Sequence, residues 1–447
     1  MAAPALVHSD GSTANLLVRE VHVLDPREGL DGPADVLIGN GLITQVAQPG
    51  TLSPKEHIEI VEGRGRHLLP AFVDPHVHLR SPGQEHKEDF ETGTRAAAAG
   101  GFGLVIAMPN TDPVLDCAPL LRSAREAASR EARVPVGFLG AITRGSNGVE
   151  LTEMAELRGA GALGFTDDGR PVSDAGLLRK ALRYQRLCGG VLTLHEEDPS
   201  LSRGGSMHEG AVSAALGIGG IPTVSESTIL ARDAELAGYE QGRVHFQHLS
   251  CESSVRAVAA AKERGFLISA EVTPHHLLMT DEHVRELDTR MKMNPPLAAE
   301  SDRVALIEGL RSGVIDCVAT DHAPHARHEK EVPFEQAPMG TTGLETAFAA
   351  LYTELVLPGT IELSLLVERM TAGAGLFELP TPRIEIGETA NVTIVDLQSE
   401  WVAGEHGWES RSENCCFAGR RLRGRVLMTI AAGSVAFRER AFSVVSA

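Results

Sequence analysis

PAFVDPHVHLR, residues 70–80, is the stretch that decides the fold. It predicts a short apolar strand that ends in His76 and His78. Side chains two residues apart in a strand point to the same side, so both imidazoles can reach one point. Two neutral imidazoles supply half of the ligands of a metal site. The alternative is a pair of polar strand-end residues without a metal, and the motif alone does not decide between the two.

The same rhythm continues through the middle of the chain, where apolar strand-like runs alternate with Ala/Leu/Glu/Arg-rich helical stretches. The strand-like runs are 68–78, 103–110, 134–142, 162–169, 191–198, 243–250, 266–276 and 316–325. Eight strands joined by helical connections predict an α/β protein, a (β/α)8 TIM-type barrel over residues 69–375. An open doubly wound sheet is the alternative, but no G-x-G-x-x-G follows a strand.

The two ends of the chain have a different sequence pattern from the middle. Residues 15–68 and 376–447 contain short segments in which apolar and polar residues alternate, broken by Gly, Asp and Pro. We expect the two segments to pair into one small β-sandwich domain beside the barrel.

Composition excludes some classes of partner. The chain has 41 basic and 60 acidic residues, a formal charge of −19, and such a surface repels nucleic acid and anionic membranes. An anionic substrate would need a local basic group. The scattered cysteines, the lack of a signal-peptide pattern and the lack of a run of about 18 apolar residues predict a cytoplasmic protein.

Polar residues stand at nearly every predicted strand end. They are His76, His78, Arg80, Asn110, Asp167, Asp168, His195, His248, His275, His276, Asp321, His322 and His325. One histidine at a strand end is more often structural than a ligand. Strand ends of a barrel face one cavity, however, so four histidines and two aspartates at five of them indicate a shared task. Strand periodicity favours His248 over His245 as a ligand and leaves Asp167 and Asp168 equal.

Six mixed nitrogen and oxygen ligands exceed what one zinc ion needs. They suit two divalent metals that share a bridging hydroxide, because metal binding lowers the pKa of water from about 15.7 to about 7. The sequence contains no G-x-S-x-G motif and no phosphate loop that would support another chemistry.

With these residues in hand, the sequence resembles the amidohydrolase superfamily and, within it, the class I dihydroorotases. The motifs HVHLRSPGQEHKEDFETGTRAAAAGGF, AMPNT, GFTDDG, GIPTVSES, EVTPHHL, KMNPPL and ATDHAPH occur in family order. The resemblance implies a barrel flanked by a β-domain built from both chain ends.

The resemblance also implies roles for individual residues. His76 and His78 would hold one metal, His195 and His248 the other, and Asp168 would bridge them in place of the carboxylated lysine of most superfamily members. Asp321 would be both a ligand and the general acid/base. Arg80, Asn110 and His325 would hold the substrate carboxylate, and Asn294, Met339 and Gly340 would contact the ring.

The implied reaction is the reversible cyclisation of N-carbamoyl-L-aspartate to L-dihydroorotate in pyrimidine biosynthesis, with zinc, two ions per subunit. We expect a homodimer and consider an association with aspartate transcarbamoylase.

Two alternatives to this function remain. One is another cyclic amidohydrolase of hydantoinase or allantoinase type, against which the absence of lysine from residues 163–169 counts. The other is a non-catalytic partner of the transcarbamoylase. The polar segment 326–340 is either a lid or an ordinary loop.

Overall fold

A computed structural model describes residues 6–53, 58–440, 442 and 445–446. Its central sheet has eight parallel strands, as predicted. A bridge between Val77 and His322 joins the first strand to the segment that follows the last one, and the His78 amide donates to the His322 carbonyl at 2.9 Å. The sheet therefore closes into a barrel. Its strands are β6 (Phe72–Val77), β7 (Phe102–Ala107), β8 (Val136–Gly140), β9 (Ala162–Phe165), β10 (Leu192–Leu194), β13 (Val244–Phe246), β14 (Ile268–Val272) and β15 (Cys317–Val318).

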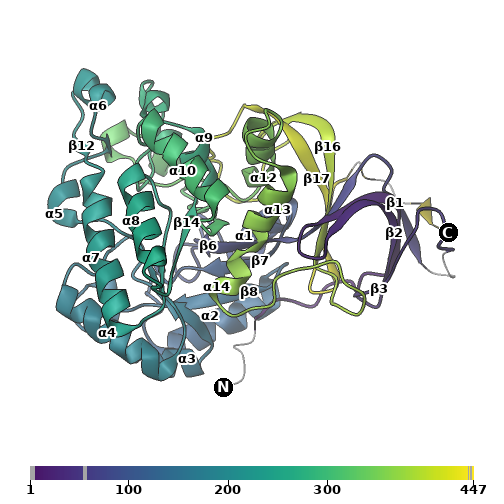
Figure 1. Ribbon diagram of the computed structural model, residues 1–447, viewed down its shortest axis with the longest axis horizontal. Coiled ribbons are helices and arrows are strands. Elements are labelled where there is room, and N and C mark those ends of the chain that lie inside the picture. The colour runs from purple at the N-terminus through teal and green to yellow at the C-terminus, as the bar shows by residue number, and fades with distance from the viewer. Residues whose placement is uncertain (1–5, 54–57, 441, 443–444, 447) are drawn as a thin grey trace.

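Helices cover the outside of the barrel (Figure 1). The first helix begins at a capping residue: the Asp89 carboxylate accepts a hydrogen bond from the Thr92 amide at 2.8 Å, which stabilises the start of the helix. The helices are α1 (Phe90–Ala99), α2 (Ala118–Glu131), α3 (Met154–Gly159), α4 (Ala175–Cys188), α5 (Pro199–Ser202), α6 (Ala211–Leu216), α7 (Val224–Glu240), α8 (Glu252–Glu263), α9 (Pro274–Leu278), α10 (Glu300–Ser312), α11 (Arg327–Lys330), α12 (Ala347–Leu351), α13 (Leu363–Thr371) and α14 (Gly373–Leu376).

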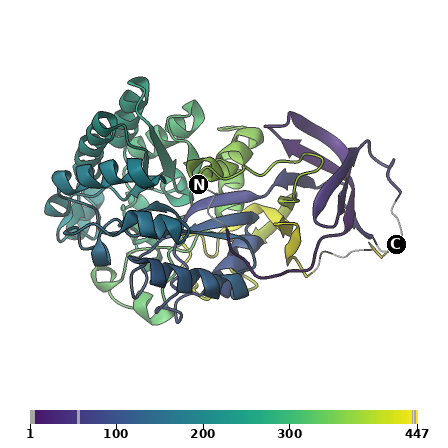
Figure 2. The same ribbon diagram turned by 90° about the horizontal axis from the view of Figure 1, so that it is seen from below.

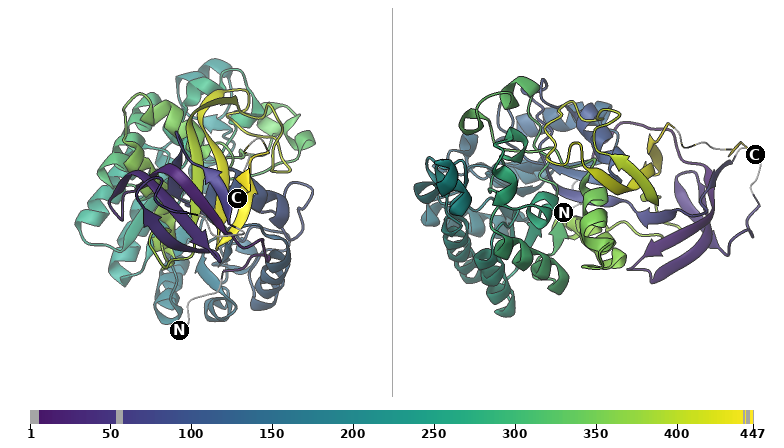
Figure 3. Two further views of the ribbon diagram at one scale, coloured as in Figure 1. Left: turned by 90° about the vertical axis from the view of Figure 1, so that its right-hand side faces the viewer. Right: turned by 90° about the horizontal axis from the view of Figure 1, so that it is seen from above.

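Strands from both chain ends form a second sheet. It runs in the order β18-β17-β16-β5-β1-β2-β3, and β4 pairs with β1 and β19. Strands from the two halves lie together at one end of the molecule (Figures 2 and 3), as the sequence predicted. Its members are β1 (Leu16–Asp25), β2 (Leu30–Gly39), β3 (Leu42–Ala47), β4 (Glu59–Glu62), β5 (His67–Pro70), β16 (Val392–Val402), β17 (Arg421–Ala431), β18 (Ser434–Arg438) and β19 (Val445–Ser446). A separate small pair, β11 (Met207–His208) and β12 (Gly220–Ile221), lies outside both sheets.

The two sheets are joined directly. Only Ala71 separates β5 of the terminal sheet from β6 of the barrel. The Phe72 ring stacks on Phe348 with 5.1 Å between ring centroids, and the Thr429 hydroxyl donates to the Ala98 carbonyl at 2.7 Å. The Phe72 contact packs the strand that leads to His76 and His78 against α12, and the Thr429 contact holds the terminal sheet against α1.

The last barrel strand is shorter than the sequence suggested. β15 covers two residues of the predicted run 316–325, and Asp321 has a positive φ of 46° that ends the extended backbone. The following segment 326–340 is folded, with α11 and a 3-10 turn at Phe334–Gln336.

Across the described parts of the chain, no helix is both long and apolar enough to cross a bilayer.

Candidate metal centre

The six candidate ligands come from five strand ends on one mouth of the barrel. Each of them is buried, and together they form what is called here the ligand cluster: His76, His78, Asp168, His195, His248 and Asp321. Parallel strands deliver their carboxyl ends to the same rim, so residues far apart in sequence meet there.

One half of the ligand cluster gathers around Asp321. Its Oδ1 lies 3.0 Å from His78 Nε2 and 3.5 Å from His76 Nε2. The ligand atoms of His76, His78 and Asp321 all lie within 4.8 Å of one another. A divalent ion between them would have two nitrogen ligands and one oxygen ligand.

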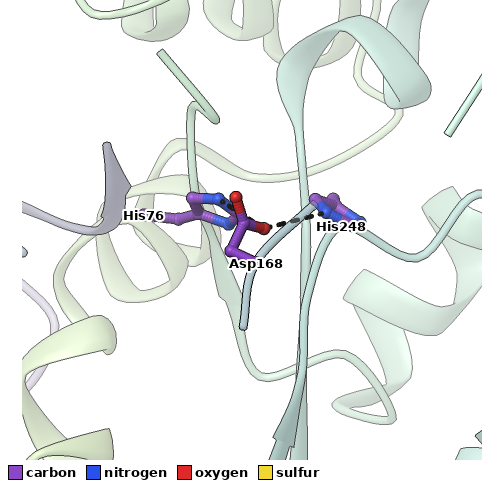
Figure 4. A group of neighbouring side chains, drawn as sticks. All are labelled: His76, Asp168 and His248. Carbon is purple, nitrogen blue, oxygen red and sulfur yellow. Dashed lines mark ion pairs between the residues drawn. The ribbon is translucent and has the colours of Figure 1, made fainter. Parts of the chain in front are cut away.

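The other half joins His195 and His248 through Asp168. His195 Nδ1 faces His248 Nε2 at 2.9 Å, and Asp168 Oδ1 is 3.9 Å from each. The same carboxylate lies 3.5 Å from His76 and from His78. Asp168 therefore lies between the two halves, with its carboxylate next to the His76 and His248 rings (Figure 4).

Neighbouring groups fix the ring nitrogens that face the centre. His76 Nδ1 is 2.7 Å from Glu271, His78 Nδ1 is 2.9 Å from Asn110 Oδ1, and His195 Nε2 is 3.1 Å from Glu197. Carboxylate oxygens and the amide oxygen of Asn110 can only accept, so each ring donates on that side. The opposite nitrogens, His76 Nε2, His78 Nε2 and His195 Nδ1, are left with lone pairs for a metal.

The electrostatics of the cluster favour a cation. Burial opposes the ionisation of Asp168 and Asp321. The histidines that face them, His76 foremost, nevertheless lower the pKa of both carboxyl groups well below the usual range. Burial also disfavours a charged His76 ring, yet Glu271, Asp168 and Asp321 raise the pKa of His76 to about 10. The position at His76 Nε2 thus attracts positive charge, which a divalent ion can supply in place of a proton.

The buried donor atoms of the ligand cluster also suit a metal ion. His76 Nε2, which faces Asp168 and Asp321, is buried and has no hydrogen-bond partner among the described residues. Buried polar atoms without partners are rare and call for an explanation such as an ion. Two histidine pairs with two carboxylates match the ligands that zinc takes in hydrolytic sites.

The residues expected to bind substrate lie beside this cluster, and they differ in how many hydrogen bonds their side chains already make within the protein. The Arg80 side chain makes one hydrogen bond to the described part of the chain, from Nε to the Pro324 carbonyl at 3.1 Å. Asn294 donates to Glu197 at 2.7 Å. Asn110 is already engaged, with Nδ2 3.2 Å from Asp168 Oδ2 as well as its contact to His78. Asn110 therefore supports the ligands directly.

His325, Met339 and Gly340 form one unit. His325 Nε2 donates to the Met339 carbonyl at 2.8 Å, and burial, aided by Arg80, lowers the pKa of His325 to about 2. A neutral His325 has no second donor, so it must release Met339 before it can bind a carboxylate. Gly340 has a φ of +131°, and a Cβ there would lie 2.8 Å from the Ala323 Cβ and 3.0 Å from His325 Nε2.

The structure distinguishes Asp168 from Asp167, which the sequence left undecided, and places His248 rather than His245 in the ligand cluster, as strand periodicity predicted. Asp167 accepts from the Ile142 and Thr143 amides at 2.9 and 3.0 Å, whereas Asp168 faces the histidines. His245 points to Ser269 and Glu271, whereas His248 faces His195.

Two acidic residues beside the cluster escaped the sequence reasoning. Glu271 contacts His76, and Glu197 contacts His195. The available signal for Glu271 was an acid inside the apolar strand ISAEV, because carboxylates are almost never fully buried unless paired.

Comparisons with known proteins identify the family of the chain. Residues 65–254 match a family model described as "Dihydro-orotase-like". A dihydroorotase of Anaeromyxobacter sp. (strain K) is 45% identical over 430 residues, 95% of this chain and 98% of that protein. A dihydroorotase of Acetivibrio thermocellus is 40% identical over 426 residues, 95% of this chain and 99% of that protein.

Solved structures show the same fold. An L-hydantoinase from Arthrobacter aurescens has a TM-score of 0.84 at 23% identity and covers 95% of this chain and 96% of its own. A dihydropyrimidinase from Brevibacillus agri has a TM-score of 0.82 at 22% identity, with 96% of both chains covered. At this identity the likeness concerns the fold alone.

Proposed function

This chain belongs to the dihydroorotase family, and from that premise we propose that it interconverts N-carbamoyl-L-aspartate and L-dihydroorotate at the ligand cluster. The observation that carries the proposal is the convergence of four histidines and two aspartates on one barrel mouth, with Arg80 beside them. A cyclic amide must be attacked by water and its nitrogen protonated. The cluster supplies acceptors for a metal, and Arg80 supplies a cation for the substrate carboxylate.

We propose zinc as the metal, with two ions per subunit. His76, His78 and Asp321 would hold one ion, His195 and His248 the other, and Asp168 both. Bound divalent metal would make a hydroxide available at neutral pH and polarise the amide carbonyl. Direct elemental analysis of purified protein tests this proposal, and fewer than two ions per chain after zinc supplementation contradicts it.

Asp321 is our candidate for the proton carrier. The low pKa of its carboxyl keeps it ionised at neutral pH, ready to take a proton. In the hydrolytic direction it receives the proton of the attacking water and delivers it to the leaving ring nitrogen. In the biosynthetic direction the transfers reverse.

Arg80 is our candidate for holding the substrate carboxylate. Its terminal guanidinium nitrogens have no hydrogen bond to the described residues, and a guanidinium fork matches a carboxylate with two parallel hydrogen bonds. Asn294 and the backbone at Met339 and Gly340 would contact the ring. His325 would join only after it leaves the Met339 carbonyl, and Asn110 would act mainly through His78 and Asp168.

A hydantoinase-like activity is the competing proposal. It draws on the shared fold of the solved hydantoinases. Against it, residues 163–169 contain no lysine, and Asp168 already stands between the two halves of the ligand cluster.

An assay of zinc-supplied protein separates these proposals. Ring opening of L-dihydroorotate is followed in the ultraviolet, with a hydantoin in parallel and metal-stripped protein as the control. Turnover of dihydroorotate alone supports the first proposal, and turnover of the hydantoin alone supports the second. Protein that binds two ions and turns over neither substrate contradicts both as activities of the isolated chain.

Two proposals concern assembly. We propose a homodimer, which sedimentation of the purified chain tests. We also propose aspartate transcarbamoylase as a partner, and full activity of the isolated chain would show that such a partner is not required.

A further inference from the structure

Glu271 lies directly behind the ligand cluster, on β14. It is fully buried, and its carboxylate Oε1 lies 2.7 Å from His76 Nδ1 while Oε2 lies 3.0 Å from His245 Nε2. Oε1 also accepts from the backbone amide of His248 at 3.3 Å. One carboxylate therefore touches the side chain of one candidate ligand and the backbone of another, in opposite halves of the cluster.

We propose that Glu271 is a positioning residue that sets the metal affinity of the ligand cluster. An ionised carboxylate is an acceptor only, so His76 must carry its proton on Nδ1 and present the lone pair of Nε2 to the metal. The Gln247 amide nitrogen lies 3.2 Å from Nδ1 and can only donate, which would favour the opposite tautomer. The Glu271 carboxylate is closer and charged, so it determines which nitrogen carries the proton. This inference rests on the proposed metal site and does not depend on the substrate.

His245 completes the arrangement from the other side. Its Nε2 donates to Glu271, and its Nδ1 faces the Ser269 hydroxyl at 2.9 Å. The carboxylate is thus held between two imidazoles and cannot rotate without losing a hydrogen bond in a site without solvent, where an unpaired charge is costly. This explains why His245, whose ring is turned away from the ligand cluster, is buried in the barrel.

The backbone contact to His248 has its own effect. His248 has a φ of +32°, a conformation that residues other than glycine seldom adopt. The hydrogen bond from its amide to Glu271 helps to hold that conformation, which directs the His248 ring toward His195 and Asp168. Glu271 therefore links the two halves of the ligand cluster.

A different use of Glu271 has to be weighed. The ligand atoms of His245, Glu271 and Cys317 lie within 4.8 Å of one another and could hold an ion of their own. Both carboxylate oxygens already accept from ring nitrogens, however, and burial raises the pKa of the Cys317 thiol well above its ordinary value. A protonated thiol is a poor metal ligand, so the geometry favours the positioning role.

The test measures zinc affinity without substrate. Glu271→Gln keeps the shape but loses the charge and one acceptor, and Glu271→Leu loses both acceptors. Cys317→Ser is the matched control from the same buried group. Affinities of the two ions are measured by chelator competition, with ions counted by elemental analysis and the absorption spectrum recorded after cobalt substitution.

We expect Glu271→Gln to weaken the ion on the His76 side at least about tenfold and Glu271→Leu up to about 100-fold, the range seen for partners of metal ligands. The His195 side should change less, and the cobalt spectrum should shift. A purely structural role would instead lower the melting temperature of the metal-free protein and leave the ratio of the two affinities unchanged.

Wild-type affinity for both ions in Glu271→Gln overturns the proposal, whether or not Glu271→Leu folds. Loss of an ion in Cys317→Ser overturns it in favour of a separate ion site. Because no substrate is present, a failure of the proposed activity would leave these outcomes unaffected.

Discussion

Asp321 combines a strained backbone with the proposed role of proton carrier. Its φ of +46° lies in the left-handed region, which aspartate tolerates better than most residues. The turn brings Oδ1 to 3.0 Å from His78 Nε2 instead of continuing β15. Strain of this kind costs about 1–3 kcal/mol and is commonly found at functional sites.

Asp321→Asn should abolish most turnover in a folded protein. The amide cannot take a proton at neutral pH, and a general base typically contributes about 10²–10⁴ in rate. Initial rates at saturating zinc, with circular dichroism as the folding control, check this. Activity near that of the wild type would remove Asp321 from the acid/base role.

Arg80→Lys should raise the Michaelis constant for dihydroorotate about tenfold or more and leave zinc content unchanged. Lysine keeps the charge but loses the two-pronged geometry. Arg144→Lys, at a half-exposed arginine after β8, is the matched control. An unchanged Michaelis constant in Arg80→Lys would contradict the carboxylate-binding role.

The residues at strand ends were predictable, and those behind them were not. His76, His78 and Asp168 stand at the end of apolar runs, which is visible in one dimension. Glu271 and Glu197 act through contacts between strands, and such contacts depend on register and ring orientation that no local pattern encodes. The engagement of His325 with Met339 likewise needs the folded segment between them.

At the scale of elements, the seam between β6 and the end of β15 depends on side chains as much as on backbone pairing. Asp74 Oδ1 accepts from the Thr320 amide at 3.1 Å, and Oδ2 accepts from the Thr320 hydroxyl at 2.5 Å. Asp74 is fully buried. This contact compensates for the shortness of β15, which the sequence pattern did not reveal.

Thr320→Val should lower the free energy of unfolding by about 1–3 kcal/mol, since it removes a donor from a buried carboxyl group. Thr193→Val is the control, because the buried Thr193 hydroxyl has no hydrogen-bond partner within the described residues. Urea unfolding of both variants checks the difference. Equal stability losses would mean that the Asp74 contact does not close the seam.

The segment 326–340 is anchored by a buried lysine. Lys330 donates to the Pro338 and Thr289 carbonyls at 2.8 and 3.0 Å. Burial, followed by the nearby Lys292, lowers the pKa of Lys330 to about 7. The segment therefore has a fixed attachment, and any opening has to break it.

Lys330→Met should flatten the rise of stability between pH 7 and pH 10. An unfolded lysine has a pKa of about 10.4, so in this window the unfolded chain binds more protons and wild-type stability increases with pH. The limiting slope for one group is about 1.4 kcal/mol per pH unit. Urea unfolding midpoints of both proteins across this pH range check the prediction. Identical slopes of stability against pH would refute the lowered pKa of Lys330.

At the scale of the whole molecule, the ligand cluster ties five strands of the barrel to one point. A metal bound there stabilises the folded chain against every form in which those strand ends have separated. The eight-strand rhythm and the pairing of the two chain ends were both predictable, because periodicity repeats along the sequence.

Zinc should therefore raise the melting temperature of metal-stripped protein, with about 2.7 kcal/mol of added stability when free zinc reaches 100 times its dissociation constant. Asp168→Ala should lose most of this response. Scanning calorimetry with and without zinc checks both. A zinc-independent melting temperature in the wild type would argue against a metal in the barrel.

The pairing of β5 with β16 also sets an order of events during protein synthesis. Pro70 pairs with Val392, and all eight barrel strands lie between them in sequence. While the ribosome makes the barrel, β5 has an unpaired edge directly before β6. The first barrel strand therefore spends most of translation attached to a half-finished sheet, and closing that sheet is a late step with a large loop to close.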